Sequence, residues 1–128
     1  MAQNGTVEAQ LRAAVVQFYK DCFGRGPTQV RVLLAADLLV CLLAGGMTAA
    51  ERSVLAGADP GRARDRVKRW HREVIEANRD RLAAALEGVL AAPVRTLHHD
   101  LSTGADECLI AVRLGPRADD AAGTPGTY

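Results

Sequence analysis

The segment from Gly24 to Gly46, GRGPTQVRVLLAADLLVCLLAGG, constrains the fold more than any other part of this sequence. Two apolar runs with β-branched residues are separated there by Ala35-Ala36-Asp37, and glycines bound the whole segment. Short apolar runs joined by a short turn predict a β-hairpin. Before and after this segment, apolar residues recur at helical spacing, so we expect flanking helices that pack on a sheet begun by this hairpin.

The two strands of this hairpin differ in their patterns. The first, from about Thr28 to Ala35, alternates apolar and polar residues over most of its length. The second, from Leu38 to Ala44, is apolar on both faces. A strand without a polar face is covered on both sides, either by helices of its own chain or by a second copy of the protein. A homodimer is therefore one expectation from this pattern.

The first helix is predicted to begin at Thr6 as N-cap and to end at Gly24. Pro27 prevents the helix from restarting, so Gly24, Arg25, Gly26 and Pro27 form a stop signal. A phosphate-binding loop is the alternative for this stretch. It is disfavoured because the GxGxxG pattern is missing and Pro27 removes a backbone donor.

Two further helices follow the hairpin. Thr48 and Glu51 have the spacing of a capping box, which predicts the start of a short second helix that ends by Gly57. The longest helix is expected from about Arg62 to Leu90, with an apolar stripe that Asn78 interrupts.

The start of that long helix is rich in arginine. Asp65 with Arg69, and Arg72 with Glu76, have the i, i+4 spacing of intrahelical ion pairs, which would make this a solvated, salt-bridged face. The alternative is a surface for an anionic partner, such as a phosphate group or a lipid. The candidate binding residues for such a partner are Arg25, Arg62, Arg64, Arg66, Arg69 and Arg72.

A second hairpin closes the fold. Its strands are expected from Val94 to about Leu101 and from Glu107 to Leu114, and residues 116–128 have the composition of a disordered tail. The sequence thus predicts one domain over residues 1–115. Its class is α+β, in the order α-β-β-α-α-β-β, with an antiparallel sheet of two hairpins on which the long helix and the N-terminal helix pack.

Composition narrows the functional classes. The chain has 128 residues, 48% of them hydrophobic, and a net charge of +1, so no global charge attracts it to nucleic acid or an anionic membrane. It shows no signal peptide and no apolar run long enough to span a bilayer, which predicts a cytoplasmic protein. Cys22, Cys41 and Cys108 have no metal-binding spacing, and we expect reduced, buried thiols.

His98, His99 and Asp100 are the only cluster that suggests chemistry. Adjacent strand residues point to opposite faces, so His98 shares a face with Asp100 rather than with His99. His71 is a third candidate for a metal or acid–base site, and ordinary hydrogen bonds at a strand end are the alternative. Because no nucleophile motif accompanies these residues, we expect no enzyme, no metal and no cofactor.

The order of elements and several residues resemble the MpsC-like domain, a bacterial family named for a cation-translocating, membrane-potential-generating system. The resemblance runs from about Val7 to Leu114, and the residues that carry it include Gly24, Gly26, Pro27, Thr48 and Glu51. Many relatives have a glycine-containing turn before the third strand, where this chain has Leu90-Ala91-Ala92-Pro93.

The resemblance implies a small domain associated with a membrane system that handles cations or bicarbonate. Our first hypothesis is a non-catalytic accessory or regulatory protein that self-associates, is peripheral to the membrane, and binds a partner such as a transport subunit through its arginine-rich helix. The second hypothesis is a nucleic-acid or phosphate-ligand binder that uses the same arginines, although nucleic acid is disfavoured. The third is a small enzyme that uses His98, Asp100 and His71.

Overall fold

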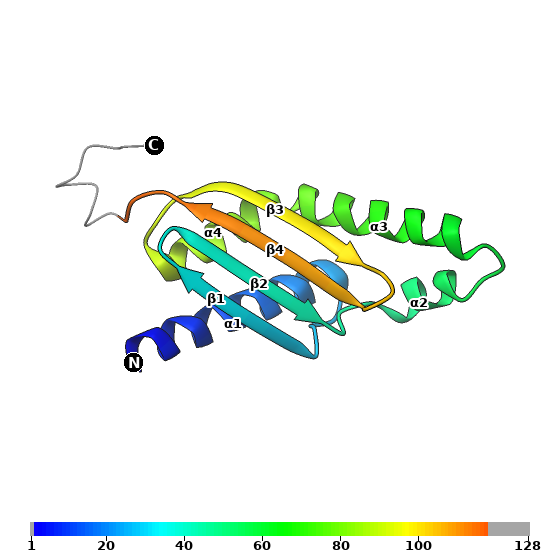
Figure 1. Cartoon of the computed structure of the whole chain (residues 1–128), viewed down its shortest axis with the longest axis horizontal. Helices are drawn as coiled ribbons and strands as arrows, with labels where there is room; N and C mark the ends of the chain where they lie inside the picture. The colour runs from blue at the N-terminus through cyan, green and yellow to red at the C-terminus, as the bar shows by residue number, and fades with distance from the viewer. Residues whose placement is uncertain (1, 118–128) are drawn as a thin grey trace.

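The computed structural model describes residues 2–117, which form four helices and a four-stranded antiparallel sheet (Figure 1). The helices are α1 (Ala2–Phe23), α2 (Ala49–Leu55), α3 (Pro60–Ala77) and α4 (Arg79–Leu90). The strands are β1 (Gln29–Ala35), β2 (Leu38–Ala44), β3 (Val94–Ser102) and β4 (Glu107–Leu114). The fold is α+β, as predicted, but it contains one helix more than the sequence pattern indicated.

Two hairpins make up the sheet, in the strand order β1-β2-β4-β3. β1 pairs with β2 from Gln29 opposite Ala44 to Ala35 opposite Leu38, and Ala36 in the turn has a φ of 54°. The helical connection from β2 carries the chain to the far edge, where β3 lies, and β4 then returns between β3 and β2. The predicted sheet of two antiparallel hairpins is therefore confirmed.

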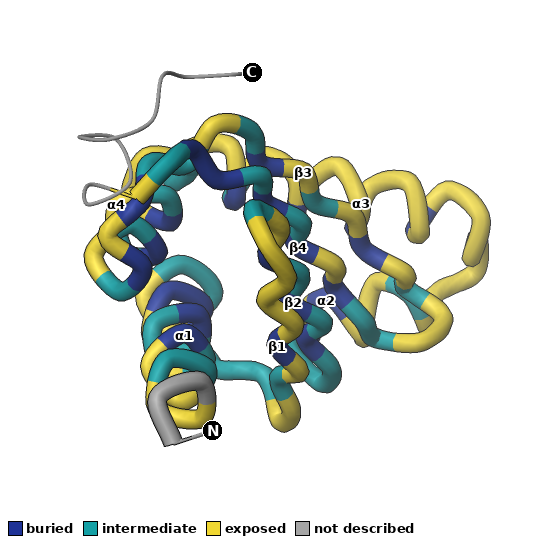
Figure 2. Tube along the Cα trace, turned by 60° about the vertical axis from the view of Figure 1, so that its left-hand side comes forward, coloured by how far each residue is buried: buried dark blue, intermediate teal, exposed yellow. Residues whose placement is uncertain are grey.

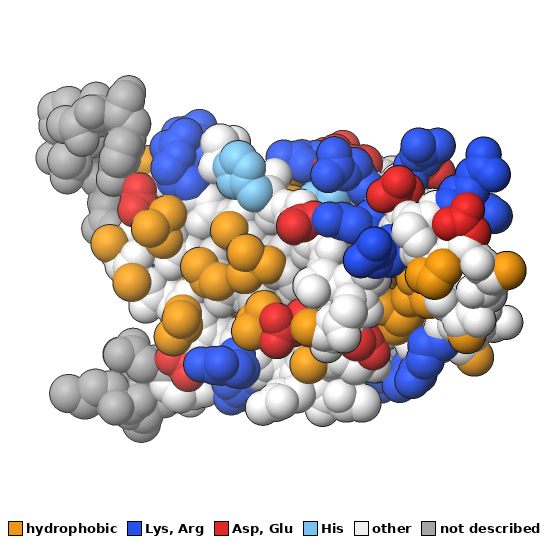
Figure 3. Space-filling model, turned by 45° about the vertical axis from the view of Figure 1, so that its right-hand side comes forward, with side chains coloured by type: hydrophobic (Ala, Val, Ile, Leu, Met, Phe, Trp, Pro, Cys, Tyr) orange, Lys and Arg blue, Asp and Glu red, His pale blue; other side chains and the backbone are white. Residues whose placement is uncertain are grey.

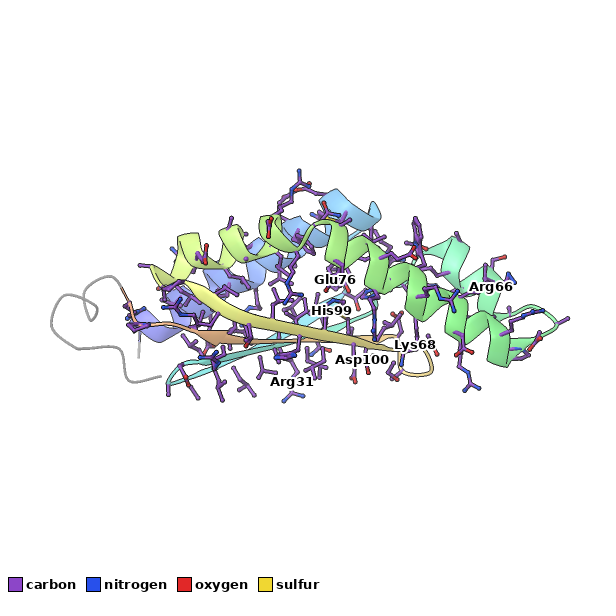
Figure 4. The ribbon with its side chains drawn as sticks, turned by 90° about the horizontal axis from the view of Figure 1, so that it is seen from above. Arg31, Arg66, Lys68, Glu76, His99 and Asp100 are labelled. Carbon is purple, nitrogen blue, oxygen red and sulfur yellow. The ribbon has the colours of Figure 1, made fainter. Side chains whose placement is uncertain are left out.

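The helices form a second layer on one side of the sheet (Figure 4). α1 packs on β1 and α4, while α3 packs on β3 and α2. Alternate residues of the central strands point into this layer, so that Leu39, Cys41 and Ile110 are fully buried. The prediction that the N-terminal and long helices pack on the sheet is confirmed.

The other side of the sheet carries no helix of the described residues (Figure 4). Its side chains are the remaining alternate residues of each strand. Most of those on β2 and β4 are apolar, and the charged ones lie on the edge strands and at the two ends of β4. We call this surface the open sheet face; its members are Gln29, Arg31, Leu33, Ala35, Leu38, Val40, Leu42, Ala44, Thr96, His98, Asp100, Ser102, Glu107, Leu109, Ala111 and Arg113. Within one chain, helices thus cover β2 on one face only.

The single long helix expected from Arg62 to Leu90 is divided at Asn78, which ends α3 and precedes α4. The Asn78 side chain donates a hydrogen bond to the Val74 carbonyl at 2.8 Å, and its φ of −115° lies outside the helical range. An asparagine amide can replace a helical hydrogen bond in this way, and the chain bends where it does. The helix predicted to start at Thr6 instead starts at Ala2.

Two of the three cysteines are buried in the core. Cys41 and Cys108 are buried, as expected, whereas Cys22 is partly exposed. Burial raises the pKa of Cys41 to about 12 and that of Cys108 to about 11, so both remain thiols at neutral pH. Of the tail predicted to be disordered, residues 118–128 lie outside the described part of the chain.

Candidate functional site

α3 carries five of the arginines that the sequence singles out, and four of them lie on its outer side. Arg64 lies on the same side as the buried Val67 and His71 but is itself exposed in the first turns of the helix. Asp59 caps this helix, because its carboxylate accepts a hydrogen bond from the Arg62 amide at 3.2 Å, and Pro60 occupies the first turn. The inner side packs on the sheet and on α2. The outer turns are exposed in Figure 2. We call the exposed arginines the α3 basic face; they are Arg62, Arg64, Arg66, Arg69 and Arg72.

Within the described part of the chain, the acidic residues of α3 form no salt bridges with these arginines. The expected ion pairs of Asp65 with Arg69 and of Arg72 with Glu76 are absent from the salt bridges of the described residues. Six basic residues and one acidic residue lie between Arg62 and Arg72. Lys and Arg side chains accordingly gather along this helix on the surface (Figure 3). The hypothesis of a salt-bridged face is wrong for these two pairs.

Glu76 has other partners. It accepts a hydrogen bond from Arg79 at 2.9 Å and is bonded to His99 Nε2 at 2.6 Å, which joins the end of α3 to β3 (Figure 4). The hydrogen bond with His99 lowers the pKa of the Glu76 carboxyl, and the charge of Arg79 adds to that shift. Glu76 is thus engaged in fixing α3 on the sheet and does not offset the arginines of the preceding turns.

A second link between α3 and β3 involves Lys68 and Asp100, whose charged atoms lie 3.4 Å apart (Figure 4). Partial burial raises the pKa of Asp100, but the Leu101 amide and the Lys68 ammonium outweigh it, so that this pKa lies below its usual value. Both side chains are well exposed, and exposed ion pairs contribute little to stability. The charge of Arg72 also lowers the pKa of Asp100, and 65% of the Asp100 side chain remains exposed to solvent.

Trp70 is the large apolar residue beside the basic face. Its side chain is 56% exposed, although tryptophan usually contributes to a core. The apolar stripe of the same helix, which includes Val67 and Ile75, is buried against the rest of the molecule. Exposed tryptophan next to arginine is typical of the residues that contribute most to protein–protein binding.

Arg25 is not part of the α3 basic face, because it contacts the start of α2 instead. Its guanidinium donates to the Met47 carbonyl at 3.3 Å, and Arg52 donates to the same carbonyl at 2.9 Å. Gly24 has a φ of 84°, and its amide donates to the Lys20 carbonyl, as expected for the end of a helix. These contacts fasten the loop between α1 and β1 to the start of α2, which gives Arg25 a structural role.

Thr48 and Glu51 form the capping box that their spacing predicts. The Thr48 hydroxyl accepts from the Glu51 amide at 3.2 Å, and Glu51 Oε1 accepts from the Thr48 amide at 2.9 Å. The second carboxylate oxygen, Oε2, is buried and has no hydrogen-bond partner among the described atoms. The structure thus places part of this carboxylate inside the molecule.

That oxygen borders a buried polar pocket. The Tyr19 hydroxyl and His71 Nε2 are 2.7 Å apart, and the Phe23 ring stacks on the imidazole at a centroid distance of 4.9 Å. The pocket has a volume of about 10 Å³, roughly the space that one water occupies. Its polar lining comes from four elements and a turn and consists of Tyr19, Glu51, His71, Asp106 and Cys108.

The protonation of this pocket follows from burial. Burial lowers the pKa of His71 to about 4 and raises the pKa of Tyr19 far above its usual value. Imidazole and phenol are therefore both neutral at pH 7. Because the pocket has room for about one water, we interpret it as a buried polar network rather than a substrate site. Tyr19 was missed in the sequence, although it follows Val15 by four residues on the buried stripe of α1.

The histidine cluster proposed from the sequence is not brought together. His98 and Asp100 lie on the open sheet face, where they are opposite Ala111 and Leu109 of β4. His71 lies on the helix side, in the buried pocket. Within residues 2–117, no group of three or more His, Cys, Asp or Glu side chains is arranged to hold a metal ion.

The sequence that forms these helices and hairpins matches a known protein family. A family model described as "Na+-translocating membrane potential-generating system (MpsC)" matches residues 3–115, which include every described strand and nearly all of α1. The chain belongs to the MpsC family. The match begins and ends close to the bounds of the described fold, so membership concerns the whole of this fold rather than one motif.

Similarity to individual proteins agrees with this membership. The MpsC chain is similar to a protein of Bacillus subtilis (strain 168) described as "Uncharacterized protein YbcI", with 26% identity over 110 residues, 86% of each chain. No solved structure matches the chain significantly. In the part of the MpsC chain that the structure describes, none of the helices combines the length and the apolar character needed to cross a membrane.

Proposed function

We propose that this MpsC protein is a non-catalytic accessory or regulatory component of a bacterial membrane system that handles cations or bicarbonate. It acts on the cytoplasmic side, peripheral to the membrane, through protein–protein contacts and self-association. Family membership supports the connection with a membrane-potential system. The α3 basic face supports a docking surface, because five exposed arginines there have no carboxylate within salt-bridge distance among the described residues.

The absence of carboxylate partners is the observation that carries this proposal. Arg62, Arg66 and Arg69 follow one another at spacings of four and three residues, so they share one side of the helix. Like charges this close on a helix repel one another unless an anion lies against them. An acidic segment of a partner protein would remove this repulsion and would form bidentate hydrogen bonds with the guanidinium groups.

A protein partner fits α3 better than a lipid surface does. Helices that lie in the membrane interface insert a wide apolar side into the acyl region. In α3 that side is buried against the sheet, where Val67 and Ile75 are 4% and 0% exposed, and only Trp70 is apolar and exposed beside the arginines. The basic face therefore offers charge and one aromatic anchor, the combination that is enriched at the centres of protein interfaces.

The experiment is a sedimentation assay with inside-out membrane vesicles from the bacterium that encodes this chain. Binding of purified protein is compared for intact vesicles, for the same vesicles after protease treatment, and for vesicles made from the extracted lipids. We expect binding to the intact vesicles only. A variant with Arg66→Glu and Arg69→Glu should lose at least about tenfold in affinity, because charged interface pairs matter most when they are reversed in sign.

The matched control reverses two exposed charges elsewhere, Lys20→Glu on α1 and Arg81→Glu on α4. It has the same net charge as the first variant, and its binding should remain near that of the wild type. Equal binding to lipid vesicles would replace the protein partner with a membrane surface. Tight binding to a short RNA or DNA duplex, with a steep loss as salt is added, would favour the phosphate-binding alternative instead.

A further inference from the structure

Three large, exposed leucines lie close together on the open sheet face. Leu33 is 63% exposed, Leu38 52% and Leu109 41%, and they lie on three neighbouring strands. Figure 3 shows hydrophobic side chains gathered on the sheet side of the molecule, away from the arginines of α3. An antiparallel sheet can leave one face in water, but that face is then normally polar.

The strand register shows which residues of this face lie side by side. Partner residues in β1, β2, β4 and β3 form rows that run straight across the sheet. The two central rows each have an apolar middle and at least one polar end. They are Leu33–Val40–Ala111–His98 and Arg31–Leu42–Leu109–Asp100.

The second of these rows has opposite charges at its two ends. Arg31 lies on the edge strand β1 and Asp100 on the other edge strand, β3. The Arg31 side chain points away from the helix layer in Figure 4, and Asp100 has 65% of its side chain exposed despite its contact with Lys68. An anionic membrane would attract Arg31 but repel Asp100, whereas a surface with the opposite charge at each edge would attract both.

A second copy of the chain is such a surface. A two-fold axis that runs along the strands, between β2 and β4, exchanges the two edges of the sheet and keeps each row in place. It puts each Arg31 opposite the partner's Asp100 and each Leu42 opposite the partner's Leu109. In the outer row this axis places Arg113 opposite the partner's Leu38. A two-fold axis across the strands would pair Arg113 with the partner's Glu107 in the outer rows. In the central rows, however, it would separate Arg31 from Asp100 and stack Arg31 on the partner's Leu33.

We propose that two copies of this protein associate through their open sheet faces, related by a two-fold axis along the strands, with Arg31 of each copy paired with Asp100 of the other. Sheets that pack face to face in this way are about 10 Å apart, with their strands within about 30° of each other. The leucines of the two central rows then form a dry layer, and the ion pairs lie at its rim.

The size of the face sets the expected strength of this dimer. Four strands about 4.8 Å apart and seven residues of about 3.3 Å rise give a face on the order of 400 Å² per copy. This lies within the range of the largest apolar patches on monomers, and two such faces together bury roughly 800 Å², which is below the range of stable specific complexes and typical of weak, transient ones. The dimer should therefore be weak and reversible, and its population should depend on protein concentration.

The test is sedimentation velocity of the purified protein from about 1 to about 200 μM, a range in which a weak, reversible dimer dissociates on dilution. The wild type should shift from monomer to dimer with concentration. Leu109→Lys, in the middle of the face, and Leu33→Lys, at its edge, should each abolish the shift. Both side chains are substantially exposed, so these variants should stay folded, as circular dichroism would verify.

Charge reversal tests the axis. Asp100→Arg places two arginines opposite each other and should weaken the dimer by about tenfold or more, and Arg31→Asp in the same chain should restore it, because the pairs are then exchanged. Arg66→Glu on α3 is the matched control and should leave dimerisation unchanged. A monomer at all concentrations, a dimer insensitive to Leu109→Lys, or a double variant that is not restored would each overturn the proposal.

Self-association on this face belongs to the proposed function but does not depend on α3. The sedimentation experiment uses the purified chain alone, whereas docking on α3 is measured with membrane vesicles. Failure of the sheet dimer would therefore leave the docking proposal in place, and failure of docking would leave the dimer in place.

Discussion

Replacing His71 should change how the stability of this protein depends on pH. The imidazole has an ordinary pKa of 6.5 in the unfolded chain and about 4 in the folded one, because burial disfavours its charged form. Between these two values the unfolded chain binds a proton and the folded chain does not. The folded state is thus at its most stable above pH 6.5, and it loses stability as the pH falls toward 4.

The magnitude follows from the size of this shift. A difference of about 2.5 pKa units corresponds to about 3 kcal/mol over the whole range, of which about 2 kcal/mol falls between pH 7 and pH 5. Glu51 and Asp106 line the pocket with His71, and the charges of His99 and Asp100 also act on the pKa of His71. These four groups are present in every variant compared, so their contributions largely cancel in the difference between variants.

The assay is urea unfolding at pH 7 and at pH 5, followed by circular dichroism. The variant carries Tyr19→Phe and His71→Phe together, because the single change at His71 would leave the buried Tyr19 hydroxyl without its partner. Tyr19→Phe alone is the matched control, since it keeps the imidazole. Between pH 7 and pH 5, the free energy of unfolding of the wild type and of the control should fall by about 2 kcal/mol more than that of the double variant. Equal losses in all three proteins would refute a buried, neutral His71.

Two further predictions concern backbone conformation, measured by urea unfolding. Ala91 ends α4 with a φ of 52°, so Ala91→Gly should stabilise the protein by about 0.5–1 kcal/mol, whereas the control Ala84→Gly, at an exposed position inside α4, should cost about 1 kcal/mol. If Ala91→Gly did not stabilise the protein, Ala91 would not be in the left-handed conformation. Gly45→Ala should cost at least about 2 kcal/mol, because its φ is 73° and the new Cβ would meet the Thr28 side chain, while Gly24→Ala, with a φ of 84° and open space, should cost about 1 kcal/mol. Equal costs would show that Thr28 moves aside.

The strands were predictable because short-range rules determine them. β2 and β4 begin and end at the residues predicted, since an apolar pattern bounded by glycine, proline and turn residues specifies a strand locally. The departure at Leu90-Ala91-Ala92-Pro93 also has a physical account. Ala91 adopts the left-handed conformation itself, where a glycine would cost less.

The break between α3 and α4 was not predictable from the apolar stripe, which continues through it. One polar residue in a buried stripe is usually tolerated, and only the hydrogen bond from the Asn78 side chain to Val74 shows that it ends a helix here. The pocket was not predictable either. Tyr19 and His71 are 52 residues apart, and no local pattern indicates which distant polar side chains a fold brings together.

The sequence pointed to both candidate surfaces, the α3 basic face and the open sheet face, but it did not show what contacts each of them makes. It identified the arginines of α3, yet the expected partners Asp65 and Glu76 have the same spacing as in any salt-bridged helix. Only the structure assigns Glu76 to Arg79 and His99. The sequence also left open whether helices or a second copy of the chain cover β2. In the fold, helices cover one face of β2 and leave its other face open.

The two proposed surfaces have an arrangement that connects them. α3 lies in the helix layer, and the open sheet face lies on the other side of the sheet (Figure 4). A dimer closed through the sheets would therefore hold both helix layers outward, each with its own α3 basic face. Two docking surfaces on one particle bind a membrane system with several copies of the partner far more tightly than one surface does, because the second contact is intramolecular. Since the dimer is expected to be weak, the amount of protein present would decide between single and double attachment, which suits a regulatory component better than a permanent subunit.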